Sequence, residues 1–191
     1  MDGLLRINMT TKQATFGKIP GRYSGLGGRG LTSAIVANEV HPQCHPLAEE
    51  NKLVMAPGLL TGTPASCSSR LSIGAKSPLT GGSKESSTGG LAGRKLARLD
   101  IAAVVIEGLP SKDSLYMIHI DSNGTTILPA DELRGLGNND TVGKLTEKYG
   151  DKVGYISIGQ AGEMKLAASS IATTDMDNAS CRHAGRGGLG A

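Results

Sequence analysis

Residues 91–106, LAGRKLARLDIAAVVI, place a short basic segment directly before the most apolar run of the chain. We predict a short helix near residues 91–99 and a buried strand over residues 101–106. Short helices set between strands are typical of the α+β class, which is the fold class that we expect here.

The sequence before this stretch predicts mostly β structure. Apolar and polar residues alternate around residues 5–9 and again around 15–19, which indicates a hairpin. A helix is expected to follow the first glycine loop, over residues 31–38. Strands are expected at 53–56 and 70–76, and the glycine- and serine-rich residues 81–90 are expected to be irregular.

The sequence after this stretch again predicts both strands and short helices. Residues 115–121 alternate, and the turn Ser122-Asn123-Gly124 leads into a partner strand at 126–128. A short helical turn is expected at 131–133. Asp140 is a predicted N-cap for a helix that runs to Lys148, and strands are predicted around 153–158 and 164–171.

Composition excludes several classes of protein. The chain has 191 residues, 38% of them hydrophobic, so residues 1–191 fit one domain. Its 20 basic and 17 acidic residues form no basic block and only five residues are aromatic, which argues against nucleic-acid binding. No apolar run is long enough for a membrane span, and the N-terminus lacks signal-peptide features. Three separated cysteines suit reduced thiols, so we expect a cytoplasmic protein without a membrane role.

Two glycine-arginine loops suggest anion binding. Residues 25–31 read GLGGRGL, and residues 182–191 read RHAGRGGLGA. Glycines let backbone N–H groups approach a ligand, and a guanidinium donates paired hydrogen bonds to phosphate. Both loops contain G-x-G-x-x-G, but neither follows a hydrophobic strand, so a dinucleotide fold is not expected. Because the second loop closes the sequence, we expect the protein to continue past Ala191.

No other motif indicates a catalytic, nucleotide-binding or metal-binding site. The chain has no G-x-x-x-x-G-K-[ST], G-x-S-x-G or H-E-x-x-H pattern. A zinc site at His41, Cys44 and His45 is an alternative, but structural zinc usually takes four such ligands. The remaining candidate feature is a set of basic side chains near loops rich in glycine, serine and threonine. This combination suits a large ligand that is partly flat and partly anionic. These cations are Arg70, Lys76, Arg94, Arg182 and Arg186. We expect the segments near residues 26, 70, 88 and 186 to share one face.

Six ordered motifs resemble the N-terminal domain of the aldehyde ferredoxin oxidoreductases, which are tungsten enzymes with some molybdenum-linked relatives. They are residues 60–63 with Arg70, residues 76–81, 89–90, 105–108, 158–163 and 184–191. The resemblance implies a β-rich domain of two halves related by a pseudo-twofold, with short helices between strands. It also implies that this domain carries a tungsten or molybdenum bis-pyranopterin cofactor.

Carried over by position, the resemblance assigns cofactor-binding roles to three segments. They are Arg70; Ser86, Ser87, Thr88, Gly89 and Gly90; and Arg182, His183, Ala184, Gly185, Arg186 and Gly187. In the family an asparagine and a backbone carbonyl bind a magnesium ion that bridges the pterin phosphates. Here Ser87 replaces the asparagine and His183 replaces a small alanine, so these two residues are the metal candidates and the magnesium expectation is weakened.

The resemblance also implies that other parts of the enzyme lie outside this chain. A [4Fe–4S] cluster needs four thiolates, so its ligands are expected in missing C-terminal domains or a complementary subunit, and no catalytic residue is assigned in this chain. The complete enzyme would oxidise aldehydes to carboxylic acids and pass electrons to ferredoxin. The alternatives are a stand-alone or remnant pterin- or phosphate-binding module without turnover, and a glycine-rich β domain that binds nothing. The aldehyde, the choice of metal and the oligomeric state, with a homo-oligomer among the options, are left open.

Overall fold

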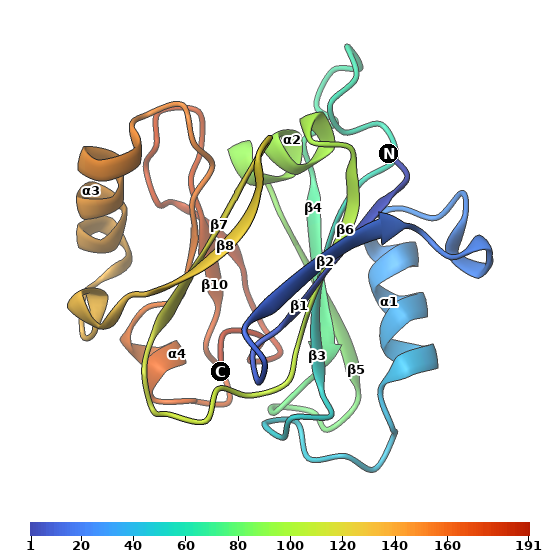
Figure 1. Cartoon of the computed structure of the whole chain (residues 1–191), viewed down its shortest axis with the longest axis horizontal. Coiled ribbons are helices and arrows are strands. Elements are labelled where there is room, and N and C mark those ends of the chain that lie inside the picture. Colours follow the sequence, from blue (N-terminus) through green and yellow to red (C-terminus); the bar gives the residue numbers. More distant parts are fainter.

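The computed structural model describes residues 1–191 and confirms an α+β fold, in which strands and short helices alternate along the chain (Figure 1). The first half contains β1 (Gly3–Asn8), β2 (Gln13–Lys18), η1 (Gly21–Tyr23), α1 (Gly28–Glu39), β3 (Lys52–Pro57), β4 (Leu71–Lys76), β5 (Ser83–Thr88), α2 (Leu91–Arg98) and β6 (Ile101–Glu107). None of the helices combines the length and the apolar composition that crossing a bilayer requires.

All six strands of the first half form one mixed sheet in the order β2-β1-β6-β3-β4-β5. Strand β6 lies in its middle, parallel to β1 and antiparallel to β3. The apolar run at residues 101–106 therefore forms a central strand, as its composition predicts. Residues 101–105 of this strand are buried.

The second half contains fewer and shorter strands. Its elements are β7 (Tyr116–Asp121), β8 (Gly124–Pro129), η2 (Asp131–Leu133), α3 (Asn138–Tyr149), β9 (Ile156–Ser157), α4 (Gln160–Glu163), β10 (Ile171–Thr173) and β11 (Arg182–Ala184). Strands β7 and β8 form a separate hairpin, and β11-β10-β9 form a three-stranded sheet.

The two halves follow the same order of elements. Each begins with an antiparallel hairpin, continues through a 3-10 helix into a Gly-Leu-Gly sequence, and then forms a 12-residue α-helix, α1 or α3. Each next contains three consecutive antiparallel strands, β3-β4-β5 or β9-β10-β11. This repeat agrees with the two related halves that the resemblance implies.

The six-stranded sheet buries apolar side chains on both faces. Helix α1 covers one face and packs around Leu31, Ile35 and Tyr23 (Figure 1). The second half covers the other face, where Ile7 and Ile73 meet Ile171 from β10. Successive residues of β1, such as Leu4 and Leu5, belong to opposite cores because side chains alternate along a strand.

A polar cluster ties α1 to the sheet. Both carboxylate oxygens of Glu39 accept hydrogen bonds from Arg6 Nη2 at 2.8 Å, and Tyr23 Oη donates to Glu39 at 2.9 Å. Burial acts to raise the pKa of Glu39, but the hydrogen bonds from Arg6 and Tyr23 outweigh it and lower that pKa below its usual 4.5. The charged carboxylate is therefore favoured in the folded state.

Most of the predicted elements are confirmed, with three corrections. Residues 83–88 form strand β5 rather than an irregular segment, because they pair along their whole length with β4. Helix α3 starts at Asn138 after an N-cap at Gly137, so Asp140 lies in its first turn and is not the cap. Residues 164–170 are not a strand, since α4 and turns precede the short β10, and β9 is shorter than predicted.

Candidate functional site

The candidate site lies where β5 meets β11 and the glycine loop that follows it. Ser86 Oγ donates a hydrogen bond to the Gly185 carbonyl at 2.6 Å, and Ser77 Oγ donates to the Gly187 carbonyl at 2.5 Å. The hydroxyls of Thr88 and Thr173 lie 2.9 Å apart. These contacts join residues that are 85 to 110 positions apart in the sequence, so they hold the two halves of the chain together at this point.

The turn after β5 is built for close packing. Gly90 has a φ of +98°, and a Cβ at this position would lie 2.2 Å from the Thr174 carbonyl oxygen. That carbonyl accepts a hydrogen bond from Leu91 N–H at 2.9 Å, and Thr173 Oγ1 donates to the Gly89 carbonyl at 3.0 Å. Only glycine satisfies both the backbone angle and the space at position 90. The turn therefore fixes Gly89 beside β10.

Open space borders two of the predicted binding glycines. A Cβ at Gly89 or at Gly185 would meet no atom within 4 Å. Gly187, by contrast, is buried, and a Cβ there would lie 2.4 Å from the Lys84 Cγ. Gly188 is packed against the Ala167 carbonyl in the same way. The main chain is thus accessible at Gly89 and Gly185, whereas Gly187 and Gly188 hold the loop in place.

Two exposed arginines flank this accessible backbone. Arg70 directly precedes Leu71, which pairs with Thr88 at the end of β5, and Arg182 pairs with Thr173 in the β10–β11 ladder. Because Thr173 also contacts Gly89, the ladders bring both arginine backbones to the same end of the sheet. Neither arginine forms an ion pair with a carboxylate.

Arg186 adds a third exposed guanidinium without a carboxylate partner. Its φ of +59° lies in the left-handed region, which side chains other than glycine, asparagine and aspartate seldom adopt. The residue is held there between Gly185 and Gly187, whose carbonyls accept the two serine hydrogen bonds described above. Together the three arginines add positive charge to the junction, although Asp175 is close enough to Arg182 for their attraction to help lower the Asp175 pKa.

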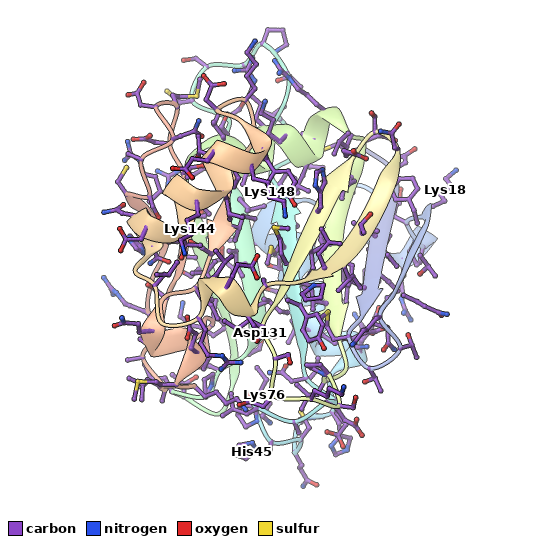
Figure 2. The ribbon with its side chains drawn as sticks, turned by 60° about the vertical axis from the view of Figure 1, so that its left-hand side comes forward. Lys18, His45, Lys76, Asp131, Lys144 and Lys148 are labelled. Atoms are coloured by element: carbon purple, nitrogen blue, oxygen red, sulfur yellow. The ribbon has the colours of Figure 1, made fainter.

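Lys76 is wrongly included among the predicted ligand cations. Its side chain is only 8% exposed, and its ammonium donates a hydrogen bond to the Pro42 carbonyl. In Figure 2 it lies at the end of the molecule where His45 is labelled. Lys76 therefore stabilises the loop before β3 and is not free to contact a ligand.

The first glycine loop reaches the same end of the sheet from the opposite face. The position of a Cβ on Gly28 lies 3.6 Å from Gly58, whose N–H donates to the Arg70 carbonyl at 3.0 Å. Arg29, at the start of α1, lies 3.8 Å from the Glu85 carboxylate. Since Glu85 and Ser86 point to opposite faces of β5, the two glycine loops flank this strand. The expectation that the segments near residues 26, 70, 88 and 186 share one face is therefore wrong for the first loop.

The two predicted metal candidates lie on different sides of β5, because the Ser87 side chain shares the face of Glu85 whereas β11, which contains His183, packs on the face of Ser86. Ser87 is half-buried in β5, and His183 is exposed in β11, with its Nδ1 3.3 Å from Ser170 Oγ. No three His, Cys, Asp or Glu side chains cluster as a metal site anywhere in the chain. The rings of His41 and His45 each accept a backbone N–H within their own loop at 3.2 Å. Magnesium binding at Ser87 and His183 stays a prediction.

A thiol lies next to Arg182. Cys181 Sγ donates a hydrogen bond to Asp175 Oδ2 at 3.0 Å, and both residues lie on the loop that joins β10 to β11. This hydrogen bond raises the pKa of the exposed Cys181 thiol and lowers the pKa of Asp175. The thiol form is favoured, so the group is not poised as a nucleophile.

Sequence reasoning missed the hydroxyl groups that hold the junction together, those of Ser77, Thr88 and Thr173. Thr88 was included only as part of a loop, and the other two were not singled out. The paired threonines Thr173 and Thr174, at and just after the end of β10, are the one local signal that could have indicated buried polar contacts.

Comparison with known proteins assigns the chain to a family. The sequence model of the family described as "Aldehyde ferredoxin oxidoreductase, N-terminal domain" matches residues 4–191. The tungsten-containing aldehyde ferredoxin oxidoreductase of Pyrococcus horikoshii is 36% identical over 192 residues, which cover 98% of this chain and 30% of that protein. The protein of the same name from Thermococcus kodakarensis is 35% identical, again with 98% and 30% coverage. The chain thus spans less than a third of the length of these relatives.

A solved structure has the same fold. The active-site complex BamBC of benzoyl coenzyme A reductase, in complex with 1,5-dienoyl-CoA, contains a chain that superposes with a TM-score of 0.89. The match has 26% sequence identity and covers 99% of this chain and 28% of that chain. The fold described above is therefore also found in one part of a larger protein.

Proposed function

Because this chain belongs to the aldehyde ferredoxin oxidoreductase family, we propose that it is the N-terminal, cofactor-cradling part of an oxidoreductase that converts aldehydes to carboxylic acids. Aldehydes are preferred as the substrate class since the relatives with that name are 35–36% identical, against 26% for the benzoyl coenzyme A reductase chain. The proposed electron acceptor of the complete enzyme is ferredoxin, which the relatives' names include.

The observation that carries the proposal is the group of exposed arginines without ion-pair partners around open glycine backbone. Arg70, Arg182 and Arg186 have no carboxylate partners, and Gly89 and Gly185 leave space beside the main chain. Guanidinium groups bind phosphate through paired hydrogen bonds, and glycine lets a flat ring approach the backbone. The donors and the space fit the phosphate ends and the flat rings of a bis-pyranopterin.

In this proposal each segment has a definite task. Arg70 and Arg182 bind anionic groups of the cofactor from either side of Gly89. Ser86 holds β5 to the C-terminal loop through Gly185, and Thr88 holds β5 to β10 through Thr173. When bound, the tungsten-pterin group supplies the redox chemistry, while the protein orients it. A magnesium ion is not part of this proposal, because the Ser87 side chain shares the face of Glu85 while β11 packs on the opposite face of β5.

The remaining parts of such an enzyme are proposed to lie outside this chain. A [4Fe–4S] cluster takes four cysteine thiolates, and the chain has three cysteines at distant positions. The longer relatives have room for further domains, since the matched region is 30% of their length. Cluster binding, substrate access and the contact with ferredoxin belong to those domains or to a second subunit.

Metal and pterin analysis after anaerobic purification from a tungstate-supplied host tests the proposal. We expect Arg70→Ala and Arg182→Ala each to lower the retained pterin and tungsten by about tenfold or more, since one lost charge-assisted hydrogen bond is worth about 1.5–3 kcal/mol. Arg98→Ala, at the exposed far end of α2, is the matched control and should retain both. Unchanged pterin content in both site variants would refute the assignment. Bound pterin without aldehyde oxidation would favour a binding module instead.

A further inference from the structure

One exposed turn of the second half contains an asparagine that is followed by glycine. Strands β7 and β8 are joined by Ser122 and Asn123, and Asp121 pairs with Gly124 across the turn (Figure 1). All four residues are exposed. Of the seven asparagines in the chain, Asn123 is the only one that precedes glycine. Asparagine is one of the thermolabile amino acids, so this turn is a candidate site of covalent change.

The reaction open to this pair is the formation of a succinimide. The Gly124 backbone nitrogen loses its proton and bonds to Cγ of the Asn123 side chain. The Cγ–Nδ2 bond breaks, and Nδ2 takes up a proton and leaves as ammonia. Water then opens the ring at either carbonyl and yields aspartate or isoaspartate at position 123. The net reaction consumes one water molecule, releases ammonia and needs no oxidant or reductant.

The surroundings of Gly124 leave room for this attack. A Cβ built on Gly124 would meet no atom within 4 Å, and glycine itself has none to obstruct the nitrogen. The Asn123 side chain has a single polar contact, a long one of 3.4 Å from Nδ2 to Asp121 Oδ2. Neither the attacking nitrogen nor the amide that leaves is therefore enclosed by packing.

The other asparagines lack this combination, because a residue with a Cβ follows each of them. Several are also held by hydrogen bonds. Asn51 Nδ2 donates to the Lys76 carbonyl at 2.9 Å. Asn178 Nδ2 donates to the Asp151 carbonyl, its Oδ1 is buried, and Ala179 follows it. Reaction is therefore expected at Asn123 ahead of the other six positions.

The Asp121 carboxylate restrains the turn. Its Oδ1 accepts hydrogen bonds from the N–H groups of Asn123 at 2.8 Å and of Gly124 at 3.1 Å. These bonds, chiefly the one from Asn123, lower the pKa of Asp121, so its charged form is favoured. The Gly124 nitrogen must lose its proton before the ring can close, and a negative nitrogen beside a carboxylate is unfavourable. The carboxylate therefore opposes the reaction that the Asn123-Gly124 sequence allows.

We propose that Asn123 is a site of spontaneous deamidation in the folded protein and that Asp121 restrains its rate. The co-reactant is water, and the products are ammonia and either aspartate or isoaspartate at position 123. The site shares no residue with the proposed cofactor site.

The modification would alter the hairpin from its turn. Isoaspartate adds one carbon atom to the main chain, so a two-residue turn could no longer keep Asp121 opposite Gly124. Aspartate would instead place a second negative charge beside Asp121. Ile120, the next residue of β7, lines an apolar cavity of about 320 Å³ together with Met55 and Ile106 of the six-stranded sheet. A change at the turn would therefore reach the packing between the two halves.

Peptide mapping after incubation at pH 8 tests the proposal. Trypsin releases residues 113–134, in which Asn123 is the only residue with a side-chain amide. The gain in mass that accompanies replacement of –NH2 by –OH in this peptide therefore reports Asn123 alone. A synthetic peptide of residues 120–125 is the unrestrained reference, and the tryptic peptides that contain Asn138, Asn139 and Asn178 are internal controls. We expect the protein to convert at Asn123, more slowly than the synthetic peptide, and the control peptides to stay unchanged.

Two variants separate the restraint from the site. Asp121→Ala removes the acceptor of the Gly124 N–H and should speed conversion about fivefold, the factor expected for the loss of one hydrogen bond. Asp113→Ala is the matched control, because it removes an exposed carboxylate without an ion pair just before the same hairpin, and it should convert at the wild-type rate. A rate in Asp121→Ala equal to or below that of the wild type would overturn the restraint. No conversion in either protein by the time the synthetic peptide has fully converted would overturn the site.

The internal controls also guard against unfolding of the variant. Faster reaction at Asn138, Asn139 or Asn178 in Asp121→Ala would indicate a loss of fold. In that case Asp121→Ser, whose hydroxyl accepts the same N–H bonds more weakly, should still convert faster than the wild type at Asn123 alone, and an unchanged rate would overturn the restraint. These outcomes do not depend on pterin binding, so failure here is distinguishable from failure of the proposed function.

Discussion

Replacing Gly90 by alanine tests the turn that fixes the candidate site. Gly90 has φ +98° and ψ −164°, a combination essentially confined to glycine, and enforcing it on alanine costs about 1–3 kcal/mol. The new Cβ would also lie 2.2 Å from the Thr174 carbonyl oxygen, which must move and weaken its hydrogen bond from Leu91 N–H. That bond is worth about 1 kcal/mol. We expect Gly90→Ala to lower the free energy of unfolding by about 2–4 kcal/mol.

The matched control is the neighbouring residue. A Cβ at Gly89 would meet no atom within 4 Å, so Gly89→Ala should change the free energy of unfolding by less than about 0.5 kcal/mol. Urea unfolding followed by circular dichroism measures both values, and the melting temperature of Gly90→Ala should fall by about 5–15 °C. If the two variants unfold within about 0.5 kcal/mol of each other, the packing described for this turn is wrong. Gly89→Ala should nevertheless reduce pterin retention if the open space beside Gly89 receives the cofactor.

Three further predictions concern other contacts. Glu39→Gln should lower the free energy of unfolding at pH 7 by about 1–3 kcal/mol, because the carboxylate accepts charge-assisted hydrogen bonds from its arginine and tyrosine partners. The folded-state pKa of Glu39 is lowered, so the charged carboxylate contributes to the free energy of unfolding above pH 4.5. This contribution is lost as the pH falls through the folded-state pKa. The variant should therefore lose less stability than the wild type in an acid titration. Thr88→Val and Thr173→Val should each lower the free energy of unfolding by about 1 kcal/mol. In a double-mutant cycle measured by urea unfolding, the two substitutions should show a coupling energy of about 0.5 kcal/mol or more. Strictly additive effects would contradict the hydroxyl contact. Asp175→Asn should speed alkylation of Cys181 by iodoacetamide at pH 8, because the hydrogen bond that raises the thiol pKa is weakened, and an unchanged rate would exclude that bond in solution.

Elements that rely on local sequence signals were predictable. The alternation in β1 and β2, the Ser122-Asn123-Gly124 turn and the apolar run of β6 specify their conformations with little help from the rest of the chain. Strand β5 was missed because its sequence, SKESST, has low β propensity. Pairing with β4 and the hydroxyl contact of Ser86 with Gly185 stabilise it, and neither can be read from a local window.

The segments of the candidate site were identified from the sequence, and their cofactor-binding role stays a prediction. The resemblance identified Arg70, the residues around Gly89 and the loop after Arg182. The structure brings Arg70, Gly89 and Arg182 to one end of the sheet, whereas the loop that follows runs along β5 to Ser77 at the other end. The resemblance could not show that Lys76 is buried against a proline carbonyl, because both residues owe their positions to the tertiary fold. The cavity beside β7 was not predicted either, since its walls come from both halves of the chain.

The backbone angle of Arg186 has a consequence for protein engineering. At φ +59° arginine has a higher backbone conformational energy than glycine or asparagine would have. A library screened for heat resistance alone would therefore enrich those two amino acids at position 186 and discard the guanidinium. Thermostabilised variants of this protein selected in that way would lose a guanidinium that we propose binds the cofactor, unless each round of screening also scored retention of tungsten.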